Sequence, residues 1–380
     1  MIRRTISRER CWRGILRVAA GRRAAISLEC ELKASYLPRD NIVMMLHAGS
    51  VARQQPTPLG PDSLTWQIFG SLYFAPTGLF LGMVQNMHPG LGAGVEFHSR
   101  IQDEFYQRVF RSAYPILGVV FDGSRARETA REIVDHHRDI KGIDAEGRRY
   151  HALDPGTFYW AHAVFFMETL RAGDLFMGGL TAAQKEQLWR EQYQWYEMYG
   201  MSMRVVPRSW PEFQQYWNDM CENMLEPTKA AWDVWHLADN APVPIFPILR
   251  RMPKPLWEWV ARPAGSGFYK FVTIGLCDPA IRRTMGFRWT DRDQRRFDRI
   301  CRLFSAMNAI TPDEVKYFAP RIRAGRRRAA GKRPATLPPP EAPELYWPAP
   351  EFRHDPKHYC PVHADFGADP VTRFRQATGF

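Results

Sequence analysis

Cysteine is scarce in this chain of 380 residues, and no two cysteines form a Cys-x-x-Cys pair. Zinc ribbons and thiol redox sites depend on such pairs, so the sequence excludes both kinds of site. Scattered thiols in a chain of this length are typical of a reducing compartment, and we expect a cytoplasmic protein, with membrane association as the open alternative. The six cysteines are Cys11, Cys30, Cys221, Cys277, Cys301 and Cys360.

Long apolar runs are also lacking. Residues 63–95 contain no Lys, Arg, Asp or Glu, which is typical of a membrane span, but Pro76 divides this stretch. Its two halves, 64–75 and 77–87, are shorter than the roughly 17 to 25 residues that a membrane-crossing helix needs. We therefore expect two buried helices here, and a transmembrane segment is the less favoured interpretation.

The body of the chain lacks a net charge, although the whole chain carries +12. Residues 1–43 contribute +6 and residues 321–333 contribute +7, which leaves −1 for the remainder. Flexible basic ends make weak, salt-dependent contacts with any polyanion. We therefore expect no specific nucleic-acid partner, while contact with a membrane surface stays open.

The charge pattern predicts one large helical domain over residues 46–320, between a basic extension at 1–45 and a basic, Pro-rich tail at 321–380. A start at Met44 or Met45 would remove the N-terminal extension. The tail also contains a cluster of candidate metal ligands, although their spacing differs from that of common zinc sites. These residues are His354, His358, Cys360 and His363.

Helical spacing dominates the chain and alternating runs of strand type are scarce, so the sequence predicts an all-α fold. One helix is expected to begin near Arg125 under a Ser124 cap and to end at Gly142. His137 falls on its apolar stripe, whereas His136 falls beside acidic residues. A buried imidazole needs a partner, which is either a core carbonyl or a metal ion.

A second inward histidine, His162, is expected on a helix that Asp154 caps and Pro155 begins. We hold two roles for it equal, because it could line a pocket or satisfy a core carbonyl. The residues that share its face are Phe158, Ala161 and Phe165.

The middle of the chain is rich in aromatic residues, with eight tryptophans from Trp189 to Trp259. Thr181 and Gln184 have the spacing of a capping box and predict the start of a helix there. Most aromatic stripes at helical spacing belong to the core. A lining rich in aromatic and Met side chains would also suit a large apolar ligand, so both interpretations stay open.

Three polar residues share one face of a helix that we expect over residues 100–113 and that Pro115 should end. Their positions at i, i+3 and i+4 bring their side chains together. One interpretation is a solvated face on which Glu104 pairs with Arg108, and the other is a functional site. The three residues are Arg108, Arg111 and Ser112.

Five short motifs follow one another along the chain: His88-Pro89, Arg108-x-x-Arg111-Ser112, His137-x-x-Ile140-x-Gly142, Asp154-Pro155 and Trp160-Ala161-His162. Their order and spacing resemble those of the latex clearing protein and MpaB-type oxygenase family, over about residues 58–320. The resemblance implies a globin-like helical core that holds haem b, with His137 as the proximal iron ligand. It further implies cofactor contacts from Arg108, Arg111 and His162.

One departure from the family pattern concerns Arg111, which occupies the position of a lysine. A lysine can lose its proton and ligate iron, whereas a guanidinium stays charged and cannot. We therefore expect an iron site open on the distal side, with Arg111 placed to donate to bound dioxygen or to a haem propionate. Arg108 and Ser112 are expected beside it as further catalytic-site residues.

The resemblance implies an enzyme that oxidises an apolar isoprenoid or lipid-like substrate with dioxygen and cleaves a double bond. The nearest candidates for its catalytic base are Glu96 and Glu104, and neither aligns with the family's base. Two other hypotheses stay open. They are a haem-binding helical protein without turnover and a protein that acts at a membrane surface.

Overall fold

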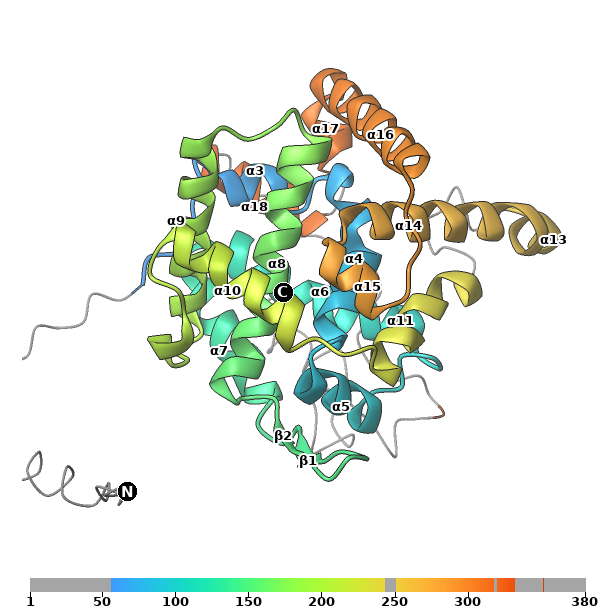
Figure 1. Cartoon of the computed structure of the whole chain (residues 1–380). Coiled ribbons are helices and arrows are strands. Elements are labelled where there is room, and N and C mark those ends of the chain that lie inside the picture. The colour runs from blue at the N-terminus through green and yellow to red at the C-terminus, as the bar shows by residue number, and fades with distance from the viewer. Residues whose placement is uncertain (1–55, 243–250, 318–319, 332–350, 352–380) are drawn as a thin grey trace, which may run out of the picture. The chain divides into compact units, whose positions relative to one another are not determined.

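Helices form nearly all of the regular structure in this computed structural model (Figure 1), and the prediction of an all-α fold is confirmed. The one sheet among the described residues is an antiparallel hairpin of β1 (Lys141–Ile143) and β2 (Arg149–His151), in which Gly142 pairs with Tyr150. The structure describes residues 56–242, 251–317, 320–331 and 351. The cluster from His354 to His363, the start at Met44 or Met45 and the extension at 1–45 lie outside them.

The uncharged stretch near the start folds into four short helices instead of the two that were expected. Pro76 lies inside the second of them, a 3₁₀ turn that runs directly into α4, and the helical stretch is interrupted earlier, at Gly70, whose φ is +86°. Within the described residues, none of the helices combines the length and the apolarity that spanning a bilayer requires. The four are α3 (Leu64–Ile68), η1 (Leu72–Thr77), α4 (Gly78–Asn86) and α5 (Pro89–His98).

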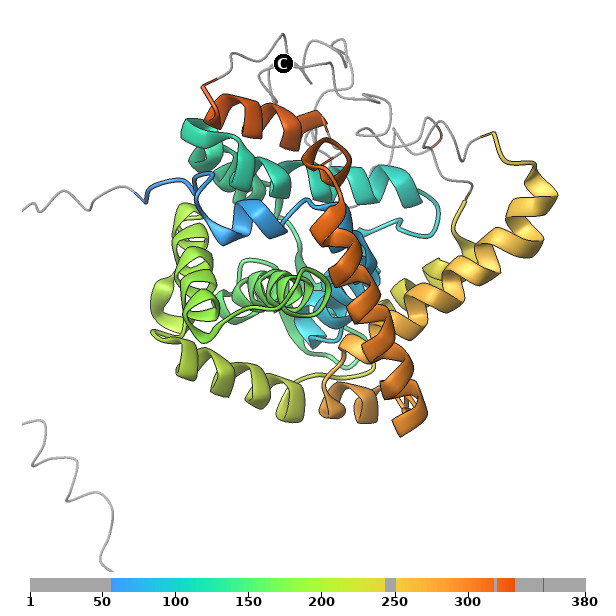
Figure 2. The same ribbon diagram turned by 90° about the horizontal axis from the view of Figure 1, so that it is seen from above.

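Helix α8 (Pro155–Arg171) is the central element, and Figure 2 shows it almost end-on among its neighbours. The Asp154 carboxylate accepts from the backbone N–H groups of Gly156 and Thr157, so the predicted cap is confirmed. Fully buried Trp160 stacks on Trp217 with 5.1 Å between ring centroids. Because α8 is buried on several sides, any polar residue on it must find a partner inside the core.

The elements after α8 wrap around it and supply most of the aromatic core. The capping box of Thr181 and Gln184 is present at the start of α9. Trp189, Trp195 and Trp217 are all buried against other rings, so these stripes belong mainly to the core. The elements are η3 (Ala172–Phe176, one turn of π-helix), α9 (Ala182–Met198), η4 (Met203–Val205), α10 (Trp210–Asn223) and α11 (Lys229–Asn240).

Helix α6 (Phe105–Phe121) differs from its prediction, because it begins later than residue 100 and continues past Pro115. The proline removes one backbone hydrogen bond, which normally interrupts a helix. Here the following turns carry Val119, Val120 and Phe121, which are buried in the core. Packing of this second half therefore outweighs the local cost of the proline.

Helix α7 (Ala126–His136) begins beside the predicted start at Arg125, but it ends six residues before Gly142, so its predicted end is wrong. Ser124 lies in the 3₁₀ turn η2 (Gly123–Arg125) and makes no cap. Gly142 lies in β1, where a Cβ atom would approach the Tyr150 hydroxyl oxygen to 2.7 Å. The glycine is therefore required for close packing in the hairpin, and it does not terminate the helix.

The last described elements extend past the expected start of the tail. Helix α18 (Pro320–Ala329) contains Ile322, which is buried against Gly70. Gly70 has a φ of +86°, and a side chain at this position would collide with Ile322. The preceding elements are α13 (Lys254–Leu256), η5 (Trp257–Ala261, a π-helical turn), α14 (Arg262–Leu276), α15 (Pro279–Thr284), α16 (Asp291–Ile310) and α17 (Asp313–Lys316).

Candidate functional site

His137 lies at the C-terminal end of α7, where it is the residue that caps the helix. Its Nδ1 atom is 2.6 Å from the carbonyl oxygen of Ile133, one turn earlier. A carbonyl can only accept, so Nδ1 carries the proton and the lone pair of the neutral ring belongs to Nε2. The ring of Phe158 packs edge-on, with 6.2 Å between centroids, and fixes the plane of the imidazole.

The surroundings of His137 favour its neutral form. Loss of contact with water lowers its pKa most, and the positive charge of Arg108 lowers it further. The hydrogen bond to Ile133 acts in the opposite direction and does not reverse the shift. The same interaction places Arg108 near His137, so two of the predicted site residues lie in one corner of the molecule.

Arg108 and Ser112 contact each other across one turn of α6, as their spacing predicts. Nη1 of Arg108 donates to the Ser112 hydroxyl, and Nε donates to the Ser99 hydroxyl at 3.2 Å. The two serines therefore hold the guanidinium in one orientation. Arg108 is partly buried, so it lies at the edge of the site and not on a freely solvated face.

Arg111 forms a buried ion pair with Glu104. Its Nη2 atom is 3.1 Å from Oε2 of Glu104, and the two side chains are 1% and 0% exposed. In the interpretation as a solvated face, Glu104 pairs with Arg108, but the ion pair that the structure shows joins Glu104 to Arg111, and it is buried. The backbone N–H of Arg108 donates to the carbonyl oxygen of Glu104 at 2.8 Å.

We name the group of Glu104, Arg108, Arg111, Ser112 and His137 the α6–α7 corner. It contains two arginines, one carboxylate and one neutral imidazole. The other candidate base, Glu96, is exposed on α5. Within the described residues, no three His, Cys, Asp or Glu side chains group together to hold a metal ion.

His162 lies in a different environment, inside the aromatic core. Its Nε2 atom is 3.0 Å from the carbonyl oxygen of Gln192, and its ring packs edge-on against Trp195 at 5.3 Å. Burial lowers its pKa to about 4, so the ring is neutral near pH 7. Of the two roles left open, the structure supports the partner of a core carbonyl.

Glu168 is a buried acid on α8 that the sequence reasoning missed. The Thr77 hydroxyl lies 2.6 Å from its Oε1 and 2.5 Å from the carbonyl oxygen of Phe74. The Thr77 hydroxyl has one proton and can donate fully to only one of these two oxygens. If Glu168 is protonated, it donates to the Thr77 hydroxyl oxygen, and Thr77 donates to Phe74. Burial also raises the pKa of Glu168 to about 8. Its position three residues after Phe165, on the predicted inward face, was the available signal.

A surface hollow lies elsewhere, along η4 and α10. It has a volume of about 670 Å³ and is lined by both basic and acidic residues, including Arg204, Arg208, Asp219 and Glu222. None of the α6–α7 corner lines it. Because its charges are mixed, this hollow does not indicate one class of ligand.

A family model described as the ER-bound oxygenase mpaB/B′/rubber oxygenase catalytic domain matches residues 66–306. Two curated relatives, an uncharacterized protein of Mycobacterium bovis and an uncharacterized protein of Mycobacterium tuberculosis, are each 24% identical over 241 residues. The alignment covers 60% of this chain and 87% of each relative. No solved structure matches. The matched residues include all five motifs and the whole α6–α7 corner.

Proposed function

Because the chain belongs to the family of mpaB and rubber oxygenase catalytic domains, we propose that it is a haem-b-dependent oxygenase. Its substrate is an apolar, isoprenoid or lipid-like molecule that reacts with dioxygen, through oxidation or cleavage of a carbon–carbon double bond. The observation that carries the proposal is the hydrogen bond from Nδ1 of His137 to Ile133.

The chemistry of His137 fits the proximal ligand of a haem iron. A ligating imidazole must be neutral, and its second nitrogen normally donates to a carbonyl or carboxylate that fixes the tautomer. Burial keeps His137 neutral, and Ile133 provides the carbonyl. A single imidazole is enough to anchor haem, so the site needs no further His, Cys, Asp or Glu ligand.

The arginines supply positive charge beside this ligand. Glu104 keeps Arg111 in place and charged, so Arg111 can hydrogen-bond but cannot ligate iron. We assign it to hydrogen bonding with dioxygen or with a haem propionate. Arg108, which Ser99 and Ser112 orient, is assigned to a propionate.

Bound haem would supply the oxygen chemistry, while the chain excludes water and orients the alkene. Phe158 packs against His137 on one side and against Tyr199 on the other, with centroids 5.3 Å apart. An apolar substrate is therefore favoured over a charged one. His162 lies behind this layer, and we assign it a structural role.

A second candidate function is haem binding without turnover. The buried pair of Glu104 and Arg111 favours it, because a carboxylate that neutralises the guanidinium weakens the attraction of Arg111 for an oxygen ligand. In this case Arg111 contributes to folding and cofactor retention only. Oxygen consumption separates the two candidates.

Haem binding is tested by reconstitution of the full chain with haemin and measurement of the Soret band. We expect one haem per chain in the wild type and a loss of about tenfold or more in retained haem for His137→Ala. His136→Ala is the matched control, since it removes the neighbouring imidazole at the same helix end. A chain that stays colourless, or an equal loss in both variants, would contradict the proposal.

Turnover is tested by oxygen uptake of the haem-loaded chain with prenyl alkenes of increasing length. The oxygenase proposal expects uptake that depends on the alkene and falls in Arg111→Met. If the chain retains haem but consumes no oxygen with any alkene of this series, the result supports the second candidate function.

A further inference from the structure

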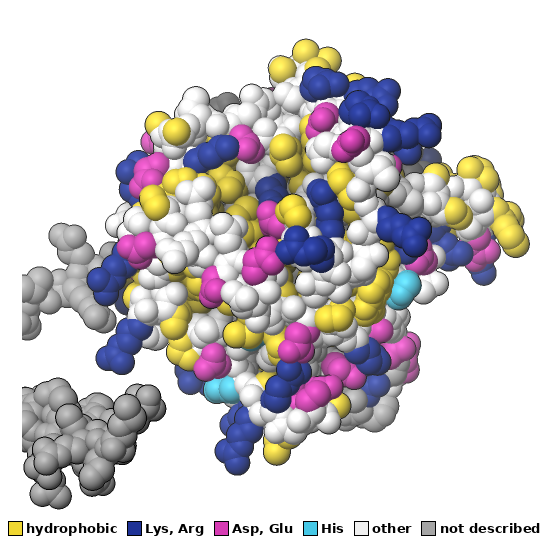
Figure 3. Space-filling view, in the orientation of Figure 1, with side chains coloured by type: hydrophobic (Ala, Val, Ile, Leu, Met, Phe, Trp, Pro, Cys, Tyr) yellow, Lys and Arg dark blue, Asp and Glu magenta, His cyan; other side chains and the backbone are white. Residues whose placement is uncertain are grey.

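The helix formed by α13, η5 and α14 projects from the body of the molecule at its α13 end (Figures 1 and 2). Three apolar side chains near this end are exposed. Trp259 is 81% exposed, Val260 57% and Leu256 46%. Leu256 is the last residue of α13, and Trp259 and Val260 lie in η5, so the three exposed side chains fall within five consecutive residues. We name this group the α13 tip, and Figure 3 shows apolar side chains gathered there.

Exposed Trp259 is the most unusual of these residues, because six of the other ten tryptophans that the structure describes are buried. It is the middle residue of η5, a turn of π-helix. Such turns are rare and often mark functional positions, since they re-aim side chains at some cost in backbone regularity. An exposed apolar cluster on a wide helical turn therefore needs an explanation outside the fold itself.

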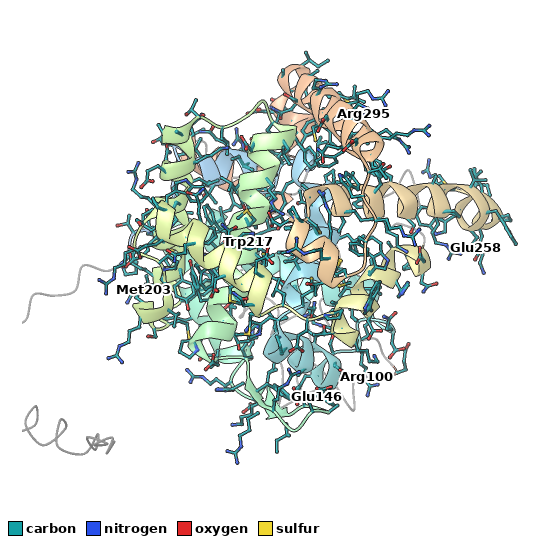
Figure 4. The ribbon with its side chains drawn as sticks, viewed as in Figure 1. Arg100, Glu146, Met203, Trp217, Glu258 and Arg295 are labelled. Atoms are coloured by element: carbon teal, nitrogen blue, oxygen red, sulfur yellow. The ribbon has the colours of Figure 1, made fainter. Side chains whose placement is uncertain are left out.

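The charges around the α13 tip are mainly positive. Arg251 and Lys254 are exposed and Arg262 is partly exposed, whereas the acid of this segment, Glu258, lies 3.7 Å from Lys254. Figure 4 labels Glu258 on the projecting helix. Tryptophan with basic neighbours is the combination that favours the interface of an anionic lipid bilayer.

The size of the α13 tip also favours lipid over a folded partner. A stable protein complex buries roughly 800 Å² on each side, and three side chains on one helical turn offer far less. A small projecting group can instead insert between lipid headgroups, where no matching surface is required. We propose that the α13 tip docks this protein onto anionic membranes, independently of haem.

Flotation of the full chain with lipid vesicles tests this proposal. We expect binding to phosphatidylcholine vesicles that contain about 30% phosphatidylserine, and weaker binding to pure phosphatidylcholine. The double variant Trp259→Ser/Val260→Ser should lose about tenfold or more in partitioning, because it removes apolar surface without changing charge. Ile310→Ser is the matched control, since Ile310 is 82% exposed on α16, and it should bind as the wild type does.

A second measurement locates the contact. Brominated lipids quench tryptophan fluorescence at short range, so the fluorescence of the bound wild type should be quenched. The Trp259→Phe variant should still bind the vesicles but lose most of that quenching. Wild-type protein that stays unbound, or an equal loss in the double variant and in Ile310→Ser, overturns the proposal. Self-association that the double variant abolishes in the absence of lipid would instead assign the α13 tip to contact between copies.

Discussion

Two histidines in different regions of this chain, half-buried His137 and buried His162, use opposite ring nitrogens. In the α6–α7 corner, His137 donates from Nδ1 to a carbonyl of its own helix. In the aromatic core, Nε2 of His162 pairs with the carbonyl of Gln192 on the next helix. Burial lowers the pKa of both, so burial alone does not separate a ligand from a core residue. We propose that the nitrogen that the backbone engages separates the ligand from the core residue.

The two regions also satisfy their polar groups differently. The α6–α7 corner pairs an arginine with a carboxylate, Arg111 with Glu104, at 3.1 Å. The core around α8 holds neutral groups, including His162 and protonated Glu168. A site for an anionic, oxygen-binding cofactor is expected in the first kind of environment. The second kind is expected to stabilise the fold.

The largest expected effect comes from breaking the charge pair of the α6–α7 corner. Glu104→Ala leaves the Arg111 guanidinium buried beside an empty position, and we expect a loss of about 3 to 5 kcal/mol in the free energy of unfolding. Urea denaturation measures it, and exposed Glu96→Ala should change stability by less than about 0.5 kcal/mol. The double variant Glu104→Leu/Arg111→Met should recover most of the loss. A single variant as stable as the control would show that the pair is not buried in solution.

Removal of His162 tests the structural role of the core histidine. His162→Ala leaves a cavity among aromatic rings and removes the side-chain hydrogen bond to the Gln192 carbonyl, so we expect a loss of about 2 to 4 kcal/mol in the free energy of unfolding. His162→Phe keeps most of the side-chain volume and should lower the free energy of unfolding by about half as much. Haem retention by the folded fraction should be unchanged. A selective loss of haem in His162→Phe, with stability kept, would assign this residue to the cofactor instead.

The raised pKa of Glu168 predicts a pH dependence of the free energy of unfolding that comes from the core and not from the α6–α7 corner. Its pKa is raised from 4.5 to about 8, so the folded chain holds a proton that the unfolded chain releases between these values. Stability contributed by this group is therefore full below about pH 4.5 and falls as the pH rises to about 8. The slope approaches about 1.4 kcal/mol per pH unit in the middle of this range.

Glu168→Gln should remove that dependence, because an amide can donate to Thr77 at any pH. Denaturant midpoints measured from pH 5 to pH 8 give the comparison. Glu197→Gln, an exposed change on α9, is the matched control and should leave the slope as it is in the wild type. If the wild-type chain and Glu168→Gln have the same slope in this range, then Glu168 is not buried as an isolated acid.

Local signals in the sequence were sufficient to predict where a helix starts when one or two side chains determine the backbone conformation there. The caps at Asp154 and Thr181 are of this kind, because each is a hydrogen bond within four residues. The ends of α6 and α7 were wrong because they depend on distant contacts. Pro115 is tolerated through core packing, and Gly142 is required by Tyr150.

The candidate site follows the same rule. The contact of Arg108 with Ser112 spans one helical turn and could be predicted, whereas the pairing of Glu104 with Arg111 spans seven residues and two turns. The α13 tip could not be predicted from the eight tryptophans of the middle region. Their sequence pattern does not distinguish the exposed ring of Trp259 from the buried ones.

The smallest expected effect is that of His137→Ala on the stability of the haem-free chain. His137 caps the end of α7, is only half-buried and bonds within its own helix, so its removal should cost about 1 kcal/mol or less. The same substitution is expected to abolish haem retention. A residue that contributes little to the fold and much to the cofactor is a ligand, whereas His162 should show the reverse. If His137→Ala instead destabilises the haem-free chain as strongly as His162→Ala does, both histidines are structural and the distinction by ring nitrogen fails.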